Sequence, residues 1–143
     1  MKAITITAAL TLLVLGGAGC SATSAPSTSA ASIDPGRVSP TDLPTPPTVQ
    51  EAQGAVRDLT LGECKTQAGK QTVSGELTSS QAERADFLVT ISWTTSTGDV
   101  MGRGFKVIQN LKPGKTKKFV ITATVAAGAT QCVPGVEFGT IEK

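Results

Sequence analysis

The chain has 143 residues, a formal net charge of +2, three Cys and no His. Without His, the commonest acid–base residue and the usual partner of a catalytic Ser or Cys are missing, so the composition argues against enzymes built on them. Aromatic residues make up 3% of the chain and Tyr is absent, so a folded core must be mainly aliphatic.

The first 19 residues have the pattern of an export signal. Met1 and Lys2 give a positive start, and residues 3–15 are apolar apart from Thr. An apolar run of about 13 residues has the length of a signal-peptide core, whereas a transmembrane helix needs about 20. Small residues fill positions 16–19, as they do at cleavage sites. We therefore expect residues 1–19 to be a signal peptide that is removed.

The end of this apolar run, Gly17-Ala18-Gly19-Cys20, resembles the lipobox of bacterial lipoprotein signal peptides, with Gly17 where such motifs usually have Leu. The resemblance implies that the chain is cut before Cys20 and that the Cys20 thiol is diacylated. The lipid would then anchor the protein in the cell membrane, on its extracytoplasmic face. The alternative is an ordinary secreted protein that is cut at a nearby small residue.

The next segment, residues 20–50, begins with Cys20 and then consists mostly of Ser, Thr, Ala and Pro, with almost no large apolar side chains. Such a composition cannot bury enough apolar surface to offset the entropy of ordering, which predicts a disordered linker. As a flexible or extended chain it would span on the order of 30–90 Å, enough to hold a folded domain away from the lipid. O-glycosylation of the Ser and Thr residues is an alternative role.

The three Cys are an odd number for an exported protein, so one of them needs a separate explanation. If Cys20 is acylated, Cys64 and Cys132 remain, 68 positions apart, and an oxidising compartment favours a disulfide between them. That bond would stabilise the fold by about 4 kcal/mol on the chain-entropy model. Two free buried thiols are the alternative. No metal or other cofactor is expected, because two Cys without His do not form a zinc ligand set.

Residues 51–143 have the pattern of one all-β domain. Strand patterns alternate with turn residues, which predicts a small antiparallel sandwich of about six or seven strands. The clearest strand has Phe87, Val89, Ile91 and Trp93 at every second position, so Trp93 is expected to pack in the core against the disulfide, with ligand stacking as the alternative. The expected strands are residues 57–64, 72–78, 87–94, 100–108, 117–125 and 131–138. The only segment that would suit a helical turn is near residues 49–57, where Gly54 counts against it, and the disulfide is expected to join the first and last strands.

The domain resembles the small immunoglobulin-like sandwiches of bacterial surface lipoproteins, in particular the FxLYD-type domains common in exported actinobacterial proteins. The resemblance covers residues 56–138 and rests on the segments at 75–80, 85–91 and 100–104, followed by the turn Leu111-Lys112-Pro113-Gly114-Lys115. The positions after Phe87 hold neither Tyr nor Asp. The resemblance implies an immunoglobulin-like fold in an extracytoplasmic lipoprotein.

The one local concentration of charge is formed by Lys112, Lys115, Lys117 and Lys118. These cations are a candidate patch for an anionic partner, whereas the alternative is that Lys on a turn and an edge strand prevents edge-to-edge aggregation. No aromatic residues lie between them, so no nucleic-acid partner is expected. The carboxylates of the domain show no catalytic spacing, and no enzyme activity is expected.

Two kinds of function remain for a tethered domain without catalytic residues. The first is a non-catalytic module that binds a protein or a cell-envelope partner, for example along a sheet edge. The second is a carrier that holds a small apolar ligand between its sheets, as the glycines of residues 100–108 would allow. A secreted or surface exclusion factor fits the same layout.

Overall fold

The computed structural model describes residues 42–142. The expected signal peptide, the expected acylation site Cys20 and most of the expected linker lie outside the described residues. The described part is all-β, with seven strands and one short 3₁₀ turn, as the alternating pattern predicted. The elements are β1 (Val49–Gly54), η2 (Val56–Asp58), β2 (Leu59–Leu61), β3 (Gly69–Thr78), β4 (Ala85–Thr94), β5 (Val100–Leu111), β6 (Thr116–Val125) and β7 (Gln131–Ile141).

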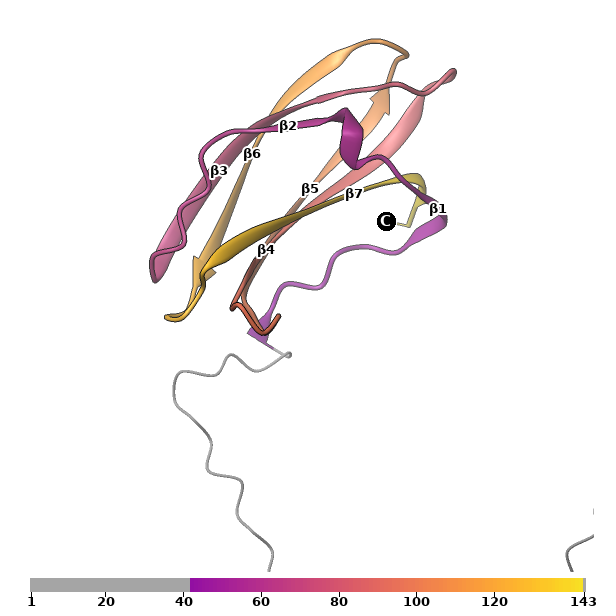
Figure 1. The fold of residues 1–143 in the computed structure, drawn as a ribbon. Helices are drawn as coiled ribbons and strands as arrows, with labels where there is room; N and C mark the ends of the chain where they lie inside the picture. The colour runs from indigo at the N-terminus through magenta and orange to yellow at the C-terminus, as the bar shows by residue number, and fades with distance from the viewer. Residues whose placement is uncertain (1–41, 143) are drawn as a thin grey trace, which may run out of the picture. The chain divides into compact units, whose positions relative to one another are not determined.

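The strands form two antiparallel sheets that pack as the two layers of a sandwich (Figure 1). One sheet has the order β1-β7-β4-β5, and the other has the order β2-β3-β6. Consecutive strands β5 and β6 belong to different sheets, and each is the edge strand of its own sheet. The segment from β5 to β6 carries the chain from one layer to the other along one open side of the sandwich. We call it the β5–β6 hairpin, although its two strands belong to different sheets and do not pair with each other.

The core forms where the period-two patterns of the two sheets face each other. On β4 the inward residues are Phe87, Val89, Ile91 and Trp93, and none of them is exposed to solvent. From the other sheet β3 and β6 contribute buried aliphatic residues at alternating positions; these are Val73, Leu77, Ile121 and Val125. Because the packing residues of both sheets are mostly aliphatic, the fold needs few aromatic side chains to fill the space between the layers.

Two glycines on β5 allow the edge strands of the two sheets to approach closely. A Cβ on Gly104 would lie 2.5 Å from Cγ2 of Ile121, and a Cβ on Gly102 would lie 2.8 Å from the carbonyl oxygen of Thr124. Real Cβ atoms do not come so close to their neighbours, so these positions require Gly. The glycines thus mark a close backbone approach, and the space beside Gly104 holds the side chain of Ile121.

The expectation of a helical turn near residues 49–57 is wrong for most of that segment. Residues 49–54 are strand β1, which pairs antiparallel with the C-terminal half of β7, and only Val56–Asp58 forms a 3₁₀ turn. The side chains of β1 are mostly exposed, so backbone pairing to β7 defines the strand and no apolar alternation marks it. Strand β1 also begins two residues before the expected start of the domain.

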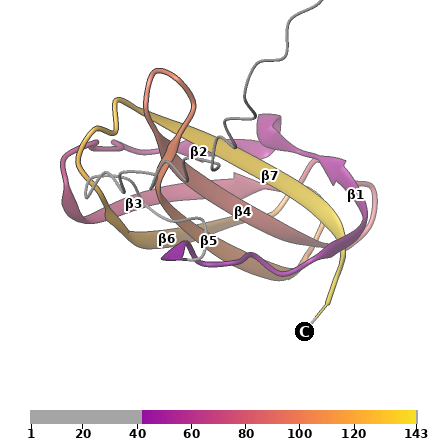
Figure 2. The same cartoon turned by 90° about the horizontal axis from the view of Figure 1, so that it is seen from below.

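Residues 42–48, expected to be linker, lie below the four-stranded sheet in Figure 1 and in front of it in Figure 2. Pro47 lines a cavity of about 390 Å³ together with Val107 and Ile141. The backbone of Thr48 accepts a hydrogen bond from the amide of Glu142 at 3.1 Å. Leu88 is 5% exposed although it alternates with the inward residues of β4, so part of this outer face is covered.

Candidate functional site

The four lysines of the predicted patch all lie on or next to the β5–β6 hairpin, and all four side chains are exposed. Lys112 and Lys115 lie in the turn, which closes with Gly114 in the left-handed region at φ 64°. The turn is tied to the end of β3, because Ser79 accepts a hydrogen bond from the amide of Gly114 at 2.8 Å and donates one to the carbonyl of Lys115 at 3.0 Å. The hairpin tip is thus held in a defined position.

The strand alternation separates the other two lysines of the patch. Lys118 lies on the outer face of β6 and pairs in register with Glu76, with which it forms an ion pair at 3.2 Å. Both side chains are well exposed, so this pair contributes at most about 1 kcal/mol to stability. Lys117 pairs in register with Leu77, which is fully buried, so Lys117 occupies an inward position at the edge of the sheet.

A fifth lysine, Lys106 on β5, belongs to the same surface and was not predicted as a site residue. It pairs in register with the fully buried Val89, so it also starts from an inward position, yet its side chain is exposed. Lysines at such positions extend along the apolar surface and place the ammonium group in water. Lys106 and Lys117 therefore emerge from the two edge strands on the same open side of the sandwich.

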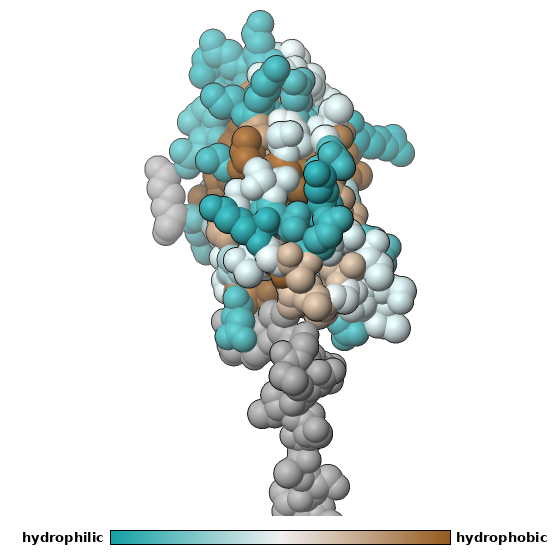
Figure 3. All heavy atoms as spheres, turned by 90° about the vertical axis from the view of Figure 1, so that its left-hand side faces the viewer, coloured by the Kyte–Doolittle hydropathy of each residue, from teal (hydrophilic) through white to brown (hydrophobic). Residues whose placement is uncertain are grey.

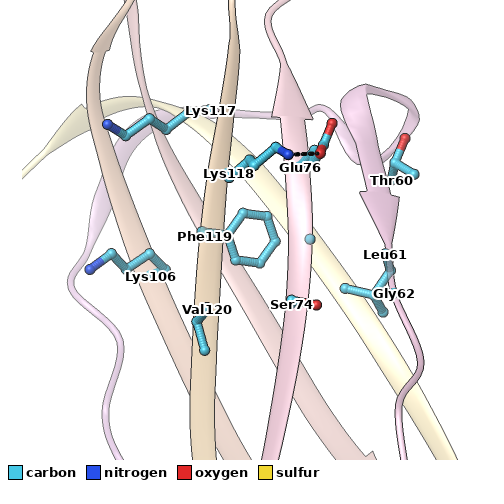
Figure 4. A pocket seen from close by; sticks show the side chains of 11 residues that line it. Thr60, Leu61, Gly62, Ser74, Glu76, Lys106, Lys117, Lys118, Phe119 and Val120 are labelled. Carbon is cyan, nitrogen blue, oxygen red and sulfur yellow. Dashed lines mark ion pairs between the residues drawn. The ribbon is translucent and has the colours of Figure 1, made fainter.

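Two of the grooves that border β6 lie beside these lysines. The larger, of about 740 Å³, crosses β6 and β3 and reaches Leu61 at the end of β2. The smaller, of about 310 Å³, lies along β5. Lys106, Lys117 and Phe119 line both of them. In Figure 4, the Phe119 ring projects between β6 and β3, while Lys106 and Lys117 extend away from β3.

The larger groove has an apolar strip between its charged groups. Val120 is 58% exposed on the outer face of β6, and Leu61 is half-buried at the far side of the groove. Phe119 is nearly buried but still borders the groove. On the side of the domain that lies to the left in Figure 1, where β3 runs, brown apolar spheres show between the hydrophilic ones (Figure 3).

The β5–β6 hairpin contains no acidic residue that would balance its positive charge. Residues 100–136 contain Arg103 and the five lysines described above but no Asp or Glu. Residues 42–142 as a whole carry ten basic and ten acidic side chains, so the excess of positive charge is local. Apart from Lys118, no lysine of the hairpin forms an ion pair with a residue that the structure describes. We call Lys106, Lys112, Lys115, Lys117 and Lys118 the cationic hairpin surface.

The predicted disulfide is present and joins Cys64 to Cys132, with 6.4 Å between the two Cα atoms. Cys132 lies on β7, the last strand, as expected, but Cys64 lies in the loop after β2 rather than on a strand. The bond therefore ties the loop between β2 and β3 to the opposite sheet. Neither cysteine belongs to the cationic hairpin surface, so the disulfide contributes to the stability of the fold and not to that surface directly.

Trp93 is a core residue that also hydrogen-bonds to the loop after β2, next to Cys64. Its side chain is fully buried, it pairs in register with Cys132, and its indole Nε1 donates a hydrogen bond to the carbonyl of Lys65 at 2.9 Å. The indole N–H thus has a partner inside the protein, and no face of the ring is open to solvent. The core interpretation of Trp93 is confirmed, and ligand stacking on it is not.

Two features that often mark a functional site, a metal-binding cluster and a membrane-spanning helix, are absent from residues 42–142. No group of three or more His, Cys, Asp or Glu side chains is placed to hold a metal ion in that range. No helix there is long and apolar enough to cross a membrane. Comparison of the chain with family models, with curated proteins and with solved structures finds no match.

Proposed function

We propose that the protein is an extracytoplasmic lipoprotein, anchored through acylated Cys20, whose β-sandwich binds a protein or envelope partner without catalysing a reaction. The observation that carries the proposal is the cationic hairpin surface on a domain whose described residues carry equal numbers of basic and acidic side chains. Of these five lysines only Lys118 has an ion-pair partner among the described residues, so the surface keeps a positive potential that attracts anionic partners and orients their approach.

The layout of the chain supports the same function. A signal peptide, an acylated Cys and a linker of about 30 residues would place the sandwich outside the membrane with freedom to reach a partner. The disulfide suits an oxidising compartment, where such bonds persist. The hairpin tip is held by two hydrogen bonds to Ser79, so the charged surface is preorganised and little ordering entropy is lost on binding.

The alternative of an apolar-ligand carrier has less support. It depended on the glycines of β5 leaving space between the sheets, but the side chains of Ile121 and Val125 approach these glycines closely. The larger groove, which borders Leu61 and Val120, is open to solvent beside β6.

Site-specific photo-crosslinking in intact cells tests the proposed function. A photoreactive residue is placed at Thr116, beside the hairpin turn, and in a matched variant at Ala127, an exposed position in the β6–β7 turn. Adducts from position 116 that are absent at position 127, and that decrease when Lys112 and Lys115 are changed to Glu, are the expected result. Equal adducts at both positions, or none, would contradict binding through the hairpin.

A further inference from the structure

Resting on the proposed function, we propose that the larger groove beside β6 binds an acidic protein segment that carries apolar side chains. The segment would place its carboxylates near Lys106 and Lys117 and its apolar side chains on the strip formed by Leu61, Phe119 and Val120. The inference adds the chemical class of the partner and a specific binding surface to the function.

Lys106 and Lys117 occupy unusual positions for charged side chains. Both occupy inward register positions, opposite the buried residues Val89 and Leu77, where a strand normally places an apolar side chain. Inward lysines on edge strands protect a sandwich from edge-to-edge association. That protective role accounts for the charges on the edges, but it does not account for an exposed apolar strip next to them.

The apolar strip beside these lysines includes an exposed side chain. Val120 is the most exposed of the large apolar side chains in residues 42–142, and it lies on the otherwise polar outer face of β6, next in sequence to Phe119. Its register partner is Ser74, and the next positions along this face hold Thr122 and Thr72, whose hydroxyl groups lie 3.3 Å apart. A polar residue would suit position 120 on a face that only contacts water. An exposed Val beside a groove offers contact area to a partner.

The lysines and the apolar strip together indicate which kind of molecule binds in the groove. An apolar centre surrounded by charged and polar groups is the usual anatomy of a protein–protein interface. A simple polyanion such as a phosphodiester chain would use the lysines but gain nothing from Leu61, Phe119 and Val120. The groove has a volume of about 740 Å³, which accommodates several side chains of an extended segment. The lining carries three lysines, Lys106, Lys117 and Lys118, against one carboxylate, Glu76, so charge complementarity favours an acidic segment.

The test uses three fluorescein-labelled 12-residue peptides and the full chain in non-ionic detergent, with binding followed by fluorescence anisotropy. The first peptide has four Glu and two Leu in a Ser/Gly background. The second replaces both Leu with Ser, and the third replaces all Glu with Gln. The first peptide is expected to bind at least roughly 5-fold more tightly than either of the others, because only it matches both the charge and the apolar strip.

Matched variants locate the site. Val120→Thr keeps the branched shape and is expected to weaken binding of the first peptide by roughly 5-fold, whereas Val133→Thr, at an exposed Val on β7, is expected to leave it within about 2-fold. Lys106→Gln with Lys117→Gln is expected to weaken binding by roughly 5- to 10-fold, and Lys70→Gln, on the same sheet but outside the groove, is the control. Circular dichroism of each variant checks the fold.

The outcomes separate the inference from the function on which it rests. Equal binding of the first two peptides, with no effect of Val120→Thr, would overturn the inference and leave a general anionic site on the cationic hairpin surface. Preferential binding of teichoic-type polymer or of anionic vesicles over all three peptides would also overturn it in favour of an envelope polymer or a lipid surface. No binding of any anionic probe would contradict the proposed function as well.

Discussion

Replacement of Gly104 with Ala tests the close approach of β5 and β6 that shapes the candidate site. The new Cβ would lie 2.5 Å from Cγ2 of Ile121 and 3.2 Å from the carbonyl oxygen of Thr122, whereas carbon atoms pack best at about 3.5–4.0 Å. Ile121 is 2% exposed, so its side chain has little room to move and β6 must shift by about 1 Å. Such overpacking costs about 1–3 kcal/mol, and the reduced entropy of the unfolded chain offsets about 0.4–1 kcal/mol.

The net expectation is a loss of about 1–2 kcal/mol in the free energy of unfolding, measured by urea denaturation with the fluorescence of buried Trp93 as the probe. Gly135→Ala is the matched control, because the nearest atom to its added Cβ is Cβ of Thr90 at 4.0 Å. This control is expected to be neutral, or to stabilise by up to about 1 kcal/mol. Equal stability of the two variants would refute the reasoning that Gly104 is required by the approach of β6.

Three further predictions concern the rest of the fold. Changing both Cys64 and Cys132 to Ser is expected to lower the free energy of unfolding by about 4 kcal/mol on the chain-entropy model, and urea denaturation of the oxidised parent and the variant would show no difference if the bond were unimportant. Trp93→Phe removes the donor to the carbonyl of Lys65 and should cost about 1–3 kcal/mol in the same assay, whereas an unchanged midpoint would contradict a buried indole hydrogen bond. Asn110→Val puts a β-branched residue at φ 54° and should lower the melting temperature, while Asn110→Gly should not.

The sequence was sufficient to predict the elements whose side chains alternate between core and solvent. Strand β4 is the clearest case, because Phe87, Val89, Ile91 and Trp93 recur at every second position and all of them are buried. This alternation is visible in the sequence because it requires apolar side chains at specific positions. The glycines of β5 were interpreted as leaving space for an apolar ligand, whereas the structure shows that they allow a close approach of β6.

Elements that depend on backbone pairing or on tertiary contacts could not be predicted from side-chain patterns. Strand β1 has mostly polar, exposed residues, and its pairing with β7 spans nearly the whole domain in sequence. Residues 42–48 have the composition of a linker, and only the folded sheet shows that they run along its outer face (Figure 2). Local composition cannot indicate such an arrangement, because the partner surface exists only after folding.

The candidate site was predicted in part for the same reason. The cluster Lys112, Lys115, Lys117 and Lys118 is contiguous in sequence, so its charge was apparent. Lys106 lies six positions before Lys112 on another sheet, and it joins the surface because β5 and β6 are edge strands that run side by side. Its pairing with Val89, and which strands form the edges of the sheets, could not be deduced from one sequence, so Lys106 was not predicted.

The membrane anchor and the disulfide are tested together by the intact mass of the native protein from the membrane fraction, measured without reductant and again after reduction and alkylation. The expected mass is that of a chain that begins at diacylated Cys20 and gains two alkyl groups only after reduction, at Cys64 and Cys132. An unacylated protein found in the culture medium would contradict the membrane anchor. Alkylation of Cys64 and Cys132 without reduction would contradict the disulfide-linked sandwich.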